Sequence, residues 1–151
     1  MRVGRCLRTA VLSLIVLSVA TDCGTPRSVV PSATLTAKQV VAVYFAAVAK
    51  GDWPTAHGCL DPAFDQLMSG APDSDFNNLK SLSHVSIGDP YPAGRPGGSE
   101  AFVETAEMAV DFDAVYNETI TVRSGPQTRF VLIGRHTAQS SWLIFGIGTG
   151  P

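Results

Sequence analysis

The apolar residues that follow residue 36 recur with the period of an α-helix. One helical face carries the apolar side chains at three- and four-residue spacing, namely Val40, Val41, Tyr44, Phe45 and Val48. Thr36 and Gln39 have the spacing of a capping box, in which each side chain bonds the other residue's backbone N–H. Gly51 is well placed to end this helix.

Two shorter helices are predicted next. Asp52 can cap a second helix, whose first turn tolerates Pro54. The Asp-Pro pair at 61–62 repeats this arrangement before a third helix over residues 63–68. Residues 69–78 contain Gly and Pro among polar residues, which predicts a loop.

From residue 79 onward the pattern changes to alternation, which is typical of strands. Residues 79–87 predict a first strand, and residues 89–99, with three Pro and three Gly, predict a long hairpin connection. Residues 100–123 have a period of two, which indicates one long bent strand or two strands in line. Their apolar parity comprises Phe102, Ala106, Met108, Val110, Phe112, Ala114 and Tyr116, and their polar parity comprises Glu107, Asp111 and Asp113.

Two further strands complete the predicted sheet. Residues 124–126 predict a turn, and residues 129–135 are apolar on both parities, as in a central strand. Residues 137–140 turn again before a last strand over 142–147. Helices followed by a meander of antiparallel strands define the α+β class.

The N-terminus has the pattern of an export signal. Arg2, Arg5 and Arg8 form a positively charged region ahead of the apolar residues 9–20. In a helix this apolar stretch extends about 18 Å, whereas the hydrocarbon core of a membrane is about 30 Å thick. The pattern therefore favours a cleaved signal peptide over a membrane span or a buried helix.

The next residues resemble the lipobox of bacterial lipoproteins. Val-Ala-Thr-Asp-Cys at 19–23 is followed by Gly-Thr-Pro, and the resemblance implies that Cys23 becomes the first residue and carries acyl chains such as palmitate. Asp22 departs from that pattern, because the residue before the cysteine is normally small. The alternative is a cut after Ala20 by the ordinary signal peptidase, which releases a soluble secreted protein.

The export signal divides the chain into three parts. A signal peptide spans 1–22, a flexible tether rich in Pro, Ser and Thr spans 23–34, and one folded domain spans 35–151. If Cys23 is lipidated, Cys59 is a lone thiol that is best explained as a small buried apolar residue. If Cys23 is free, a disulfide between the two becomes an option in an oxidising compartment.

Both ends of the folded part carry a family resemblance. Val-Tyr-Phe-Ala-Ala-Val at 43–48, followed by Lys-Gly-Asp-Trp at 50–53, resembles the opening of the nuclear-transport-factor-2-like (cystatin-like) superfamily. The ending Ser-Trp-Leu-Ile at 141–144, with the glycine-rich residues 146–151, is similar to the close of a bacterial lipoprotein family of unknown function within that superfamily. The resemblance spans residues 36–151. It implies a cone, in which a strongly curved antiparallel sheet wraps around the helices and leaves a pocket between them.

Composition and metal-ligand spacing exclude several classes of protein. The 151 residues are 45% apolar and 16% charged, which excludes a disordered tail, and the net charge of −2 offers no basic surface for nucleic acid. His57, His84 and His136 are too scattered for a zinc motif. Residues 73–77 begin like a calcium loop, but Asn78 and His84 replace its glycine and its final glutamate. We therefore expect no metal and no cofactor.

The alternation over residues 100–123 bears on the choice between binding and catalysis. A catalytic pairing of His84 with Asp111 or Asp113 needs these side chains inside the cone, but both acids lie on the polar, solvated parity. We therefore expect no catalytic residue. The side chains expected to line a pocket are Tyr44, Phe102, Met108, Phe112 and Tyr116.

The sequence thus favours a non-enzymatic module, held by its lipid at the outer face of a bacterial cell membrane, that binds a small apolar ligand or an envelope protein. One alternative is a small isomerase- or dehydratase-like enzyme of the same fold, which requires an acid or a histidine with a shifted pKa inside the cone. Another is a purely structural accessory domain whose cone is filled by its own side chains. Trp53 and Trp142 are expected to be structural anchors, at the corner between the first two helices and in the last strand.

Overall fold

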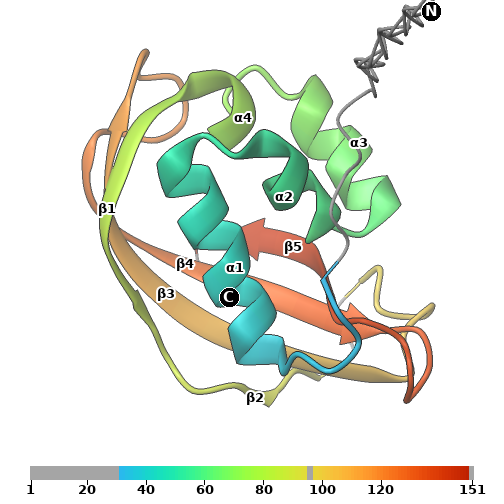
Figure 1. Ribbon diagram of the computed structural model, residues 1–151. Helices are drawn as coiled ribbons and strands as arrows, with labels where there is room; N and C mark the ends of the chain where they lie inside the picture. The colour runs from blue at the N-terminus through green and yellow to red at the C-terminus, as the bar shows by residue number, and fades with distance from the viewer. Residues whose placement is uncertain (1–30, 95–96, 150–151) are drawn as a thin grey trace, which may run out of the picture.

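The computed structural model describes residues 31–94 and 97–149, which form a helical first half and a β-sheet second half (Figure 1). The helices are α1 (Ala37–Lys50), α2 (Trp53–Gly58), α3 (Pro62–Gly70) and α4 (Asp75–Asn78). The strands are β1 (Leu79–Ile87), β2 (Tyr91–Pro92), β3 (Glu104–Tyr116), β4 (Gly125–Arg135) and β5 (Leu143–Gly148). The α+β class expected from the sequence is confirmed.

Short-range hydrogen bonds fix the ends of the helices. The Thr36 hydroxyl accepts from the Gln39 backbone N–H over 3.3 Å, and the Gln39 side chain accepts from the Thr36 N–H over 2.8 Å, so the predicted capping box is present. Asp52 and Asp61 cap α2 and α3 by accepting from backbone N–H groups of their first turns. Gly51 ends α1 with a φ of +68°, a conformation that glycine adopts without steric cost.

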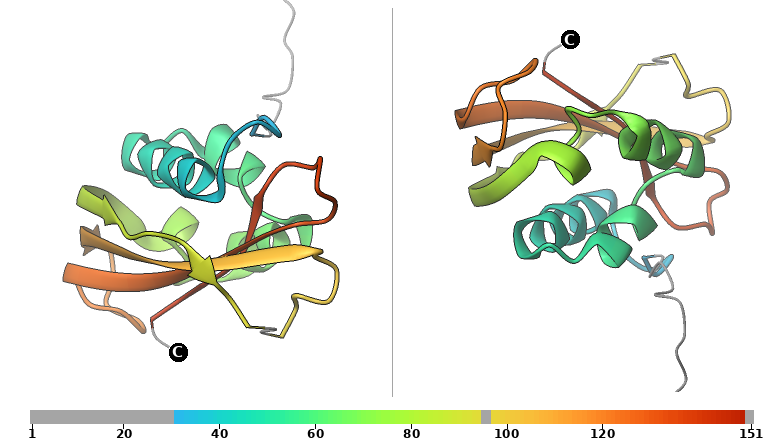
Figure 2. Two further views of the ribbon diagram at one scale, coloured as in Figure 1. Left: turned by 90° about the horizontal axis from the view of Figure 1, so that it is seen from below. Right: turned by 90° about the horizontal axis from the view of Figure 1, so that it is seen from above.

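All strand pairs are antiparallel, in the order β1-β3-β4-β5, with β2 paired to β3. The helices lie on one face of the sheet, and β1 and β3 bend along α1 (Figures 1 and 2). We call the face toward the helices the inner face and the opposite one the outer face. Val110 of β3 lies opposite Arg129 of β4, so Arg129 shares the inner face with the core residue Val110.

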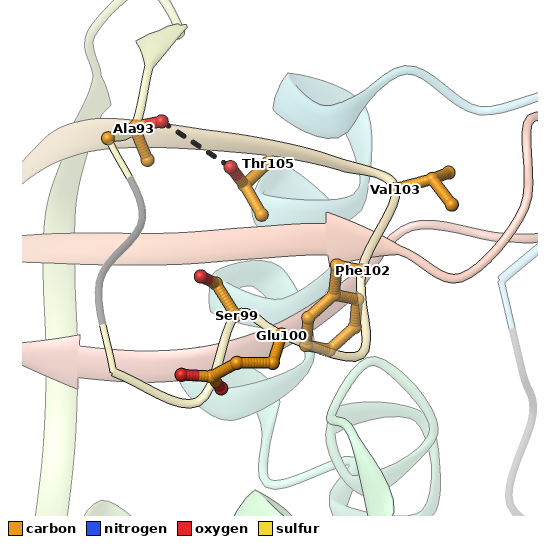
Figure 3. Close-up of a pocket in the computed structure, with 7 residues that line it drawn as sticks. Ala93, Ser99, Glu100, Phe102, Val103 and Thr105 are labelled. Atoms are coloured by element: carbon orange, nitrogen blue, oxygen red, sulfur yellow. Dashed lines mark hydrogen bonds between the residues drawn. The ribbon is translucent and has the colours of Figure 1, made fainter.

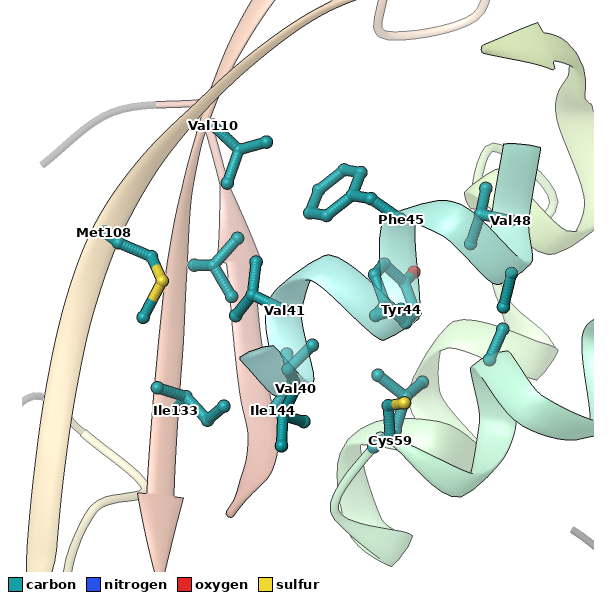
Figure 4. Close-up of a cluster of buried hydrophobic side chains, with 14 of the residues drawn as sticks. Val40, Val41, Tyr44, Phe45, Val48, Cys59, Met108, Val110, Ile133 and Ile144 are labelled. Atoms are coloured by element: carbon teal, nitrogen blue, oxygen red, sulfur yellow. The ribbon is translucent and has the colours of Figure 1, made fainter. Parts of the chain in front are cut away.

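The core lies between α1 and the inner face of the sheet (Figure 4). Tyr44, Met108 and Ile133 are completely buried, and Phe45 packs on Phe112 with ring centroids 5.4 Å apart. The buried side chains of β3 are those of the predicted apolar parity, namely Ala106, Met108, Val110, Phe112, Ala114 and Tyr116. Burying one large apolar side chain stabilises a fold by about 1.5–3 kcal/mol, so this layer is a major source of stability.

The strand predicted over residues 100–123 is shorter than its alternating pattern. Only its central part, β3, pairs with neighbouring strands. Before β3 the chain turns, and the Phe102 N–H donates to the Ser99 carbonyl over 3.0 Å. After β3 the Asn78 side chain bonds the backbone N–H and the carbonyl of Glu118, each over 2.9 Å. Local polar contacts thus end the strand where alternation alone predicts that it continues.

Three stretches predicted as connections contain regular structure. The polar loop predicted over 69–78 ends in the four-residue helix α4. The proline-rich connection predicted over 89–99 contains the two residues of β2, which pair with β3. The turn predicted over 124–126 overlaps the start of β4, where Gly125 lies opposite Ala114.

The described chain joins the fold earlier than the domain boundary predicted at residue 35. Pro31 is buried, and its carbonyl accepts a hydrogen bond from the Ser141 hydroxyl over 2.6 Å. The predicted signal peptide over 1–22 and the predicted lipid site at Cys23 lie outside the described residues. Within 31–94 and 97–149, no helix has the length and apolar character needed to cross a membrane.

A parallel bridge ties the helical half of the chain to the edge strand β5. Leu60 pairs with Ile144 in this bridge. The Ile144 N–H donates to the Cys59 carbonyl over 2.9 Å, and the Asp61 N–H donates to the Ile144 carbonyl over 2.8 Å. The segment between α2 and α3 is therefore hydrogen-bonded along the free side of β5.

Candidate functional site

A cavity of about 150 Å³ lies where α3 and α4 meet β4 and β5, and we call it the α4–β4 cavity. Its apolar lining consists of Met68, Ala71, Val122 and Ile147, and its polar lining consists of Asp73, Ser74, Asp75, Thr121 and Arg129. Apolar walls with a few converging polar groups are the usual composition of a small-molecule site. We therefore take this cavity as the candidate functional site.

Three side chains from three elements form a hydrogen-bonded chain beside the cavity. Arg129 of β4 donates from Nη2 to the Tyr116 hydroxyl over 3.1 Å. That hydroxyl, at the end of β3, donates to Oδ1 of Asp75 in α4 over 3.4 Å. No ion pair joins Arg129 to a carboxylate in the described part of the chain. A phenol thus connects the guanidinium to the carboxylate.

Asp75 is the most buried acid of this site, with 7% of its surface exposed. Burial raises the pKa of the Asp75 carboxyl, because the charged form loses its water, while the positive charge of Arg129 and the hydrogen bond from Tyr116 act in the opposite direction. The net effect is a raised pKa. At a given pH a larger fraction of Asp75 is therefore protonated than of an exposed aspartate.

Two donors beside Asp75 have unused hydrogen-bonding capacity. Nε of Arg129 and the hydroxyl of Tyr44 are buried and have no hydrogen-bond partner among the described residues. The described residues give Nη1 of Arg129 no partner either, since its one hydrogen bond there is made by Nη2. Burial, followed by the nearby charge of Asp75, raises the pKa of Tyr44 well above its usual value. Tyr44 therefore stays protonated, and its hydroxyl keeps the ability to donate.

Asparagine side chains hold the segments that surround the cavity. Asn78 fixes the loop after β3 through Glu118, and Asn77 donates to the carbonyls of Ser69 and Ala71 over 3.1 and 2.8 Å. Across the cavity the Thr121 hydroxyl donates to a carboxylate oxygen of Asp73 over 2.6 Å.

The calcium-like stretch at 73–77 therefore contributes a cavity wall. Asp73 is held by Thr121, and Asp75 is turned toward Tyr116. The described residues contain no group of three or more His, Cys, Asp or Glu side chains that could hold a metal ion.

The five side chains expected to line a pocket are not brought together. Tyr44, Met108 and Phe112 are packed in the closed core, with 0–3% of their surface exposed, and so they leave no open pocket between them. Tyr116 extends from the core to the α4–β4 cavity through its bond to Arg129. Phe102 lies on the outer face of the sheet.

Phe102 is on the outer face, although its parity predicts the inner one. Gly134 of β4 lies opposite Thr105 of β3, and both residues face outward. A Cβ atom at Gly134 would lie 2.6 Å from the Phe102 ring, so this ring covers the outer face at Gly134. Since Phe102 precedes β3, the alternation of the strand does not set its direction. It stacks there on His136 and Phe145, with ring centroids 4.5 and 4.6 Å apart.

Phe102 also lines an outer pocket of about 510 Å³ (Figure 3). The other residues of this pocket are Ala93, Gly94, Ser99, Glu100, Val103 and Thr105. Its rim includes a hydrogen bond from the Thr105 hydroxyl to the Ala93 carbonyl over 3.4 Å. The pocket is formed by the connection before β3 and lies apart from the core.

The histidine–aspartate pairing weighed in the sequence exists, but on the outer face. Nδ1 of His84 lies 2.8 Å from a carboxylate oxygen of Asp113, with 82% of the His84 side chain exposed. Asp111 accepts a hydrogen bond from the Thr128 hydroxyl over 2.6 Å. These residues line a shallow groove of about 250 Å³ beside β3 and β4, away from the α4–β4 cavity.

A second histidine–aspartate pair was missed by sequence reasoning. Nδ1 of His57 in α2 lies 2.5 Å from Oδ1 of Asp65 in α3, and the imidazole stacks on Phe76 with ring centroids 4.2 Å apart. His57 and Asp65 are eight residues apart in the sequence, so no short motif predicts that they pair. Nearby, Cys59 is buried and forms no disulfide with a described residue, and burial raises the pKa of its thiol to about 11, which disfavours the reactive thiolate.

Comparison of the chain with protein-family models, with curated proteins and with solved structures finds no match.

Proposed function

We propose that this protein is an exported binding module, anchored by a lipid on Cys23 at the outer face of a bacterial membrane, that takes a small ligand into the α4–β4 cavity. In this proposal the protein is not an enzyme. The observation that carries it is the cavity itself, to which α3, α4, β4 and β5 each contribute side chains, with both apolar and polar groups facing the same space.

The anchoring part of the proposal is supported by the order of features at the N-terminus. Arg2, Arg5 and Arg8 precede a short apolar stretch, and Cys23 then begins a segment rich in Gly, Thr, Pro and Ser. Two or more acyl chains give stable attachment to a membrane, whereas one gives marginal binding. Pro31, which is buried in the fold, lies eight residues after Cys23 in the sequence, so the domain would stand close to the membrane surface.

The proposal also includes membership of the nuclear-transport-factor-2-like superfamily. Its support is the order of elements, with helices first and an antiparallel meander second, together with strands that bend along α1 (Figure 1). The resemblance implies a pocket between the sheet and the helices, and the α4–β4 cavity is lined by residues of α3, α4, β4 and β5.

The filled core changes the kind of ligand from that expected from the sequence. Tyr44 and Met108 are completely buried, so an apolar ligand has no space beside them. The free volume of about 150 Å³ lies at the polar end, next to Asp75 and Arg129. A small ligand with a polar group fits this site better than a large apolar one.

Methyl NMR of the methionines tests the binding proposal directly. Met68 lines the cavity and Met108 lies in the closed core, so the second methyl group serves as an internal control. The mature protein is titrated with three compounds of similar size, propionate, propionamide and propylamine. We expect at least one to shift the Met68 signal and leave that of Met108 in place.

A variant that fills the cavity completes the test. Ala71→Leu places a larger side chain in the cavity wall, and Ala101→Leu makes the same change at an exposed position. We expect Ala71→Leu to abolish the Met68 shift and Ala101→Leu to preserve it. If none of the three compounds moves the Met68 signal, the cavity is not a binding site.

One observation favours a second candidate function, a small acid–base enzyme. Asp75 is a buried acid with a raised pKa that faces a cavity beside a tyrosine and an arginine, and perturbed acids of this kind occur at catalytic sites. Turnover of a bound compound that stops in Asp75→Asn, while binding persists, would establish this function in place of simple binding.

A further inference from the structure

The charge of Arg129 points to the chemical class of the ligand. Its guanidinium is permanently positive, its Nε is buried without a partner, and no carboxylate of the described residues pairs with it directly. A partly buried cation that no carboxylate contacts directly is costly, because the lost hydration is only partly replaced by the hydroxyl of Tyr116 and the more distant charge of Asp75. An anion in the adjoining cavity would supply the missing partner.

The cavity limits the size of that anion. Its volume of about 150 Å³ is below the range of about 300–1,000 Å³ that is typical of sites for drug-sized ligands, so the site suits a small ligand. The lining of the cavity also includes the apolar side chains of Met68, Val122 and Ile147. A short hydrocarbon tail suits these walls, and a planar carboxylate suits the fork of the arginine.

On these grounds, and resting on the proposed binding function, we propose that the α4–β4 cavity binds a free short-chain carboxylate with Arg129 as its anchor. The carboxylate would accept from Nε and from one N–H of Nη2, while the other N–H of Nη2 remains bonded to Tyr116. The acyl chain would lie against Met68 and Ile147.

Asp75 makes this binding dependent on pH. The groups that face Asp75 are Arg129 from β4 and Tyr116 from β3, with Tyr44 of α1 nearby and Asp73 in the same loop. The His57–Asp65 pair also lies near this site, because His57 stacks on Phe76, the residue after Asp75. An ionised Asp75 repels a bound anion and a protonated one does not, so anion affinity should rise as the pH falls and Asp75 takes up its proton.

The test compares ligands that differ in charge and share one shape. Propionate is expected to shift the Met68 signal, and its neutral isostere propionamide and the cation propylamine are expected to bind at least tenfold more weakly. Preferential binding of propylamine would show that Asp73 and Asp75 select a cation and would overturn the proposal. Binding of propionamide as tight as that of propionate would also overturn it, while leaving the proposed binding function in place.

Variants then assign the anchor. Arg129→Gln should weaken propionate binding by about 10- to 100-fold, the effect of losing a charge-assisted hydrogen bond. Arg129→Lys keeps the charge and should retain part of the affinity. A shift of the Met108 signal in Arg129→Gln would indicate that this variant alters the fold. In that case the affinity of Arg129→Lys and the comparison of the three ligands test whether Arg129 is the anchor. Unchanged affinity in both variants would overturn the role of Arg129.

Methanesulfonate isolates the contribution of Asp75, because it stays ionised across the pH range of the experiment. In the native protein its affinity should rise as the pH is lowered. In Asp75→Asn its affinity should be higher at neutral pH and should vary less with pH, because Asp73 is then the one carboxylate left in the described lining of the cavity. A native affinity that is independent of pH, or an Asp75→Asn variant that binds the anion less well, would contradict the coupling between Asp75 and the anion.

Discussion

The Tyr116 hydroxyl accepts a hydrogen bond from Nη2 of Arg129 over 3.1 Å, so a phenol rather than a carboxylate holds the guanidinium on the inner face of the sheet. Because the phenol then donates to Asp75, the positive and negative groups are coupled without touching. This arrangement leaves Nη1 of Arg129 and Oδ2 of Asp75 without hydrogen-bond partners among the described residues. The polar chain is thus a partly satisfied network, and networks of this kind respond strongly to the loss of a member.

Two tyrosine variants test whether that network stabilises the fold. Tyr116→Phe removes the hydroxyl that bonds Arg129 and Asp75, and we expect it to lower the free energy of unfolding by about 1–3 kcal/mol. Tyr44→Phe removes a buried hydroxyl that has no partner among the described residues, so it should leave stability unchanged or raise it. Urea unfolding of both variants measures the difference. An equal loss of stability in Tyr116→Phe and Tyr44→Phe would contradict the stabilising role of the Tyr116 hydroxyl.

The raised pKa of Asp75 predicts how stability varies with pH. The folded state holds this proton more tightly than the unfolded state, so the contribution of Asp75 to stability falls as the pH rises from the ordinary aspartate range through the raised folded-state value. Asp75→Asn removes this loss. We expect it to be more stable than the native protein at neutral pH, with the difference shrinking in acid. Urea unfolding from pH 3 to pH 8 measures the difference in stability between the variant and the native protein. If the fold stabilises the charged form of Asp75 instead, the variant will be the less stable of the two at neutral pH.

The two tryptophans should differ in their contribution to stability. Trp142 is 8% exposed and carries the Arg135 guanidinium 5.0 Å from its ring centre, whereas Trp53 is only partly buried and meets Phe76 edge-on at 5.6 Å. Trp142→Ala should cost about 3–5 kcal/mol, as expected for a large buried ring, and Trp53→Ala should cost less. Thermal unfolding ranks them. A larger loss for Trp53→Ala would reverse the assignment.

The outer His84–Asp113 pair offers a control for the inner site. The double variant His84→Ala, Asp111→Asn alters only the groove on the outer face. Ligand shifts at Met68 should therefore be the same as in the native protein. Loss of ligand binding in this variant would mean that the outer groove, and not the α4–β4 cavity, is the binding site.

Intact mass of the mature protein tests its attachment to the membrane. We expect a chain that begins at Cys23 and carries the added mass of acyl groups. Cys23→Ser should release the protein from membranes or leave its signal peptide uncut. A native chain that begins at Thr21 with no lipid mass would instead identify a secreted protein cut after Ala20.

The elements of the fold could be predicted because their signals are local. The capping box of Thr36 and Gln39 and the alternation around Met108 each depend on residues a few positions apart. The candidate site depends on Asp75 and Arg129, which come from the two halves of the chain. The one available signal is that Arg129 shares the inner parity of β4 with Val131 and Ile133. The apolar character of both parities of β4 hides that signal.

The bridge between Leu60 and Ile144 affects whether the sheets of two copies of this domain can pair edge to edge. An exposed edge strand offers unpaired N–H and carbonyl groups to a neighbouring chain and so promotes aggregation. At β5 the N–H and the carbonyl of Ile144 are already bonded within the molecule. At the opposite edge, β1 is broken by two irregularities in its register. Both outer strands of the sheet therefore carry features that disfavour the joining of sheets between crowded copies.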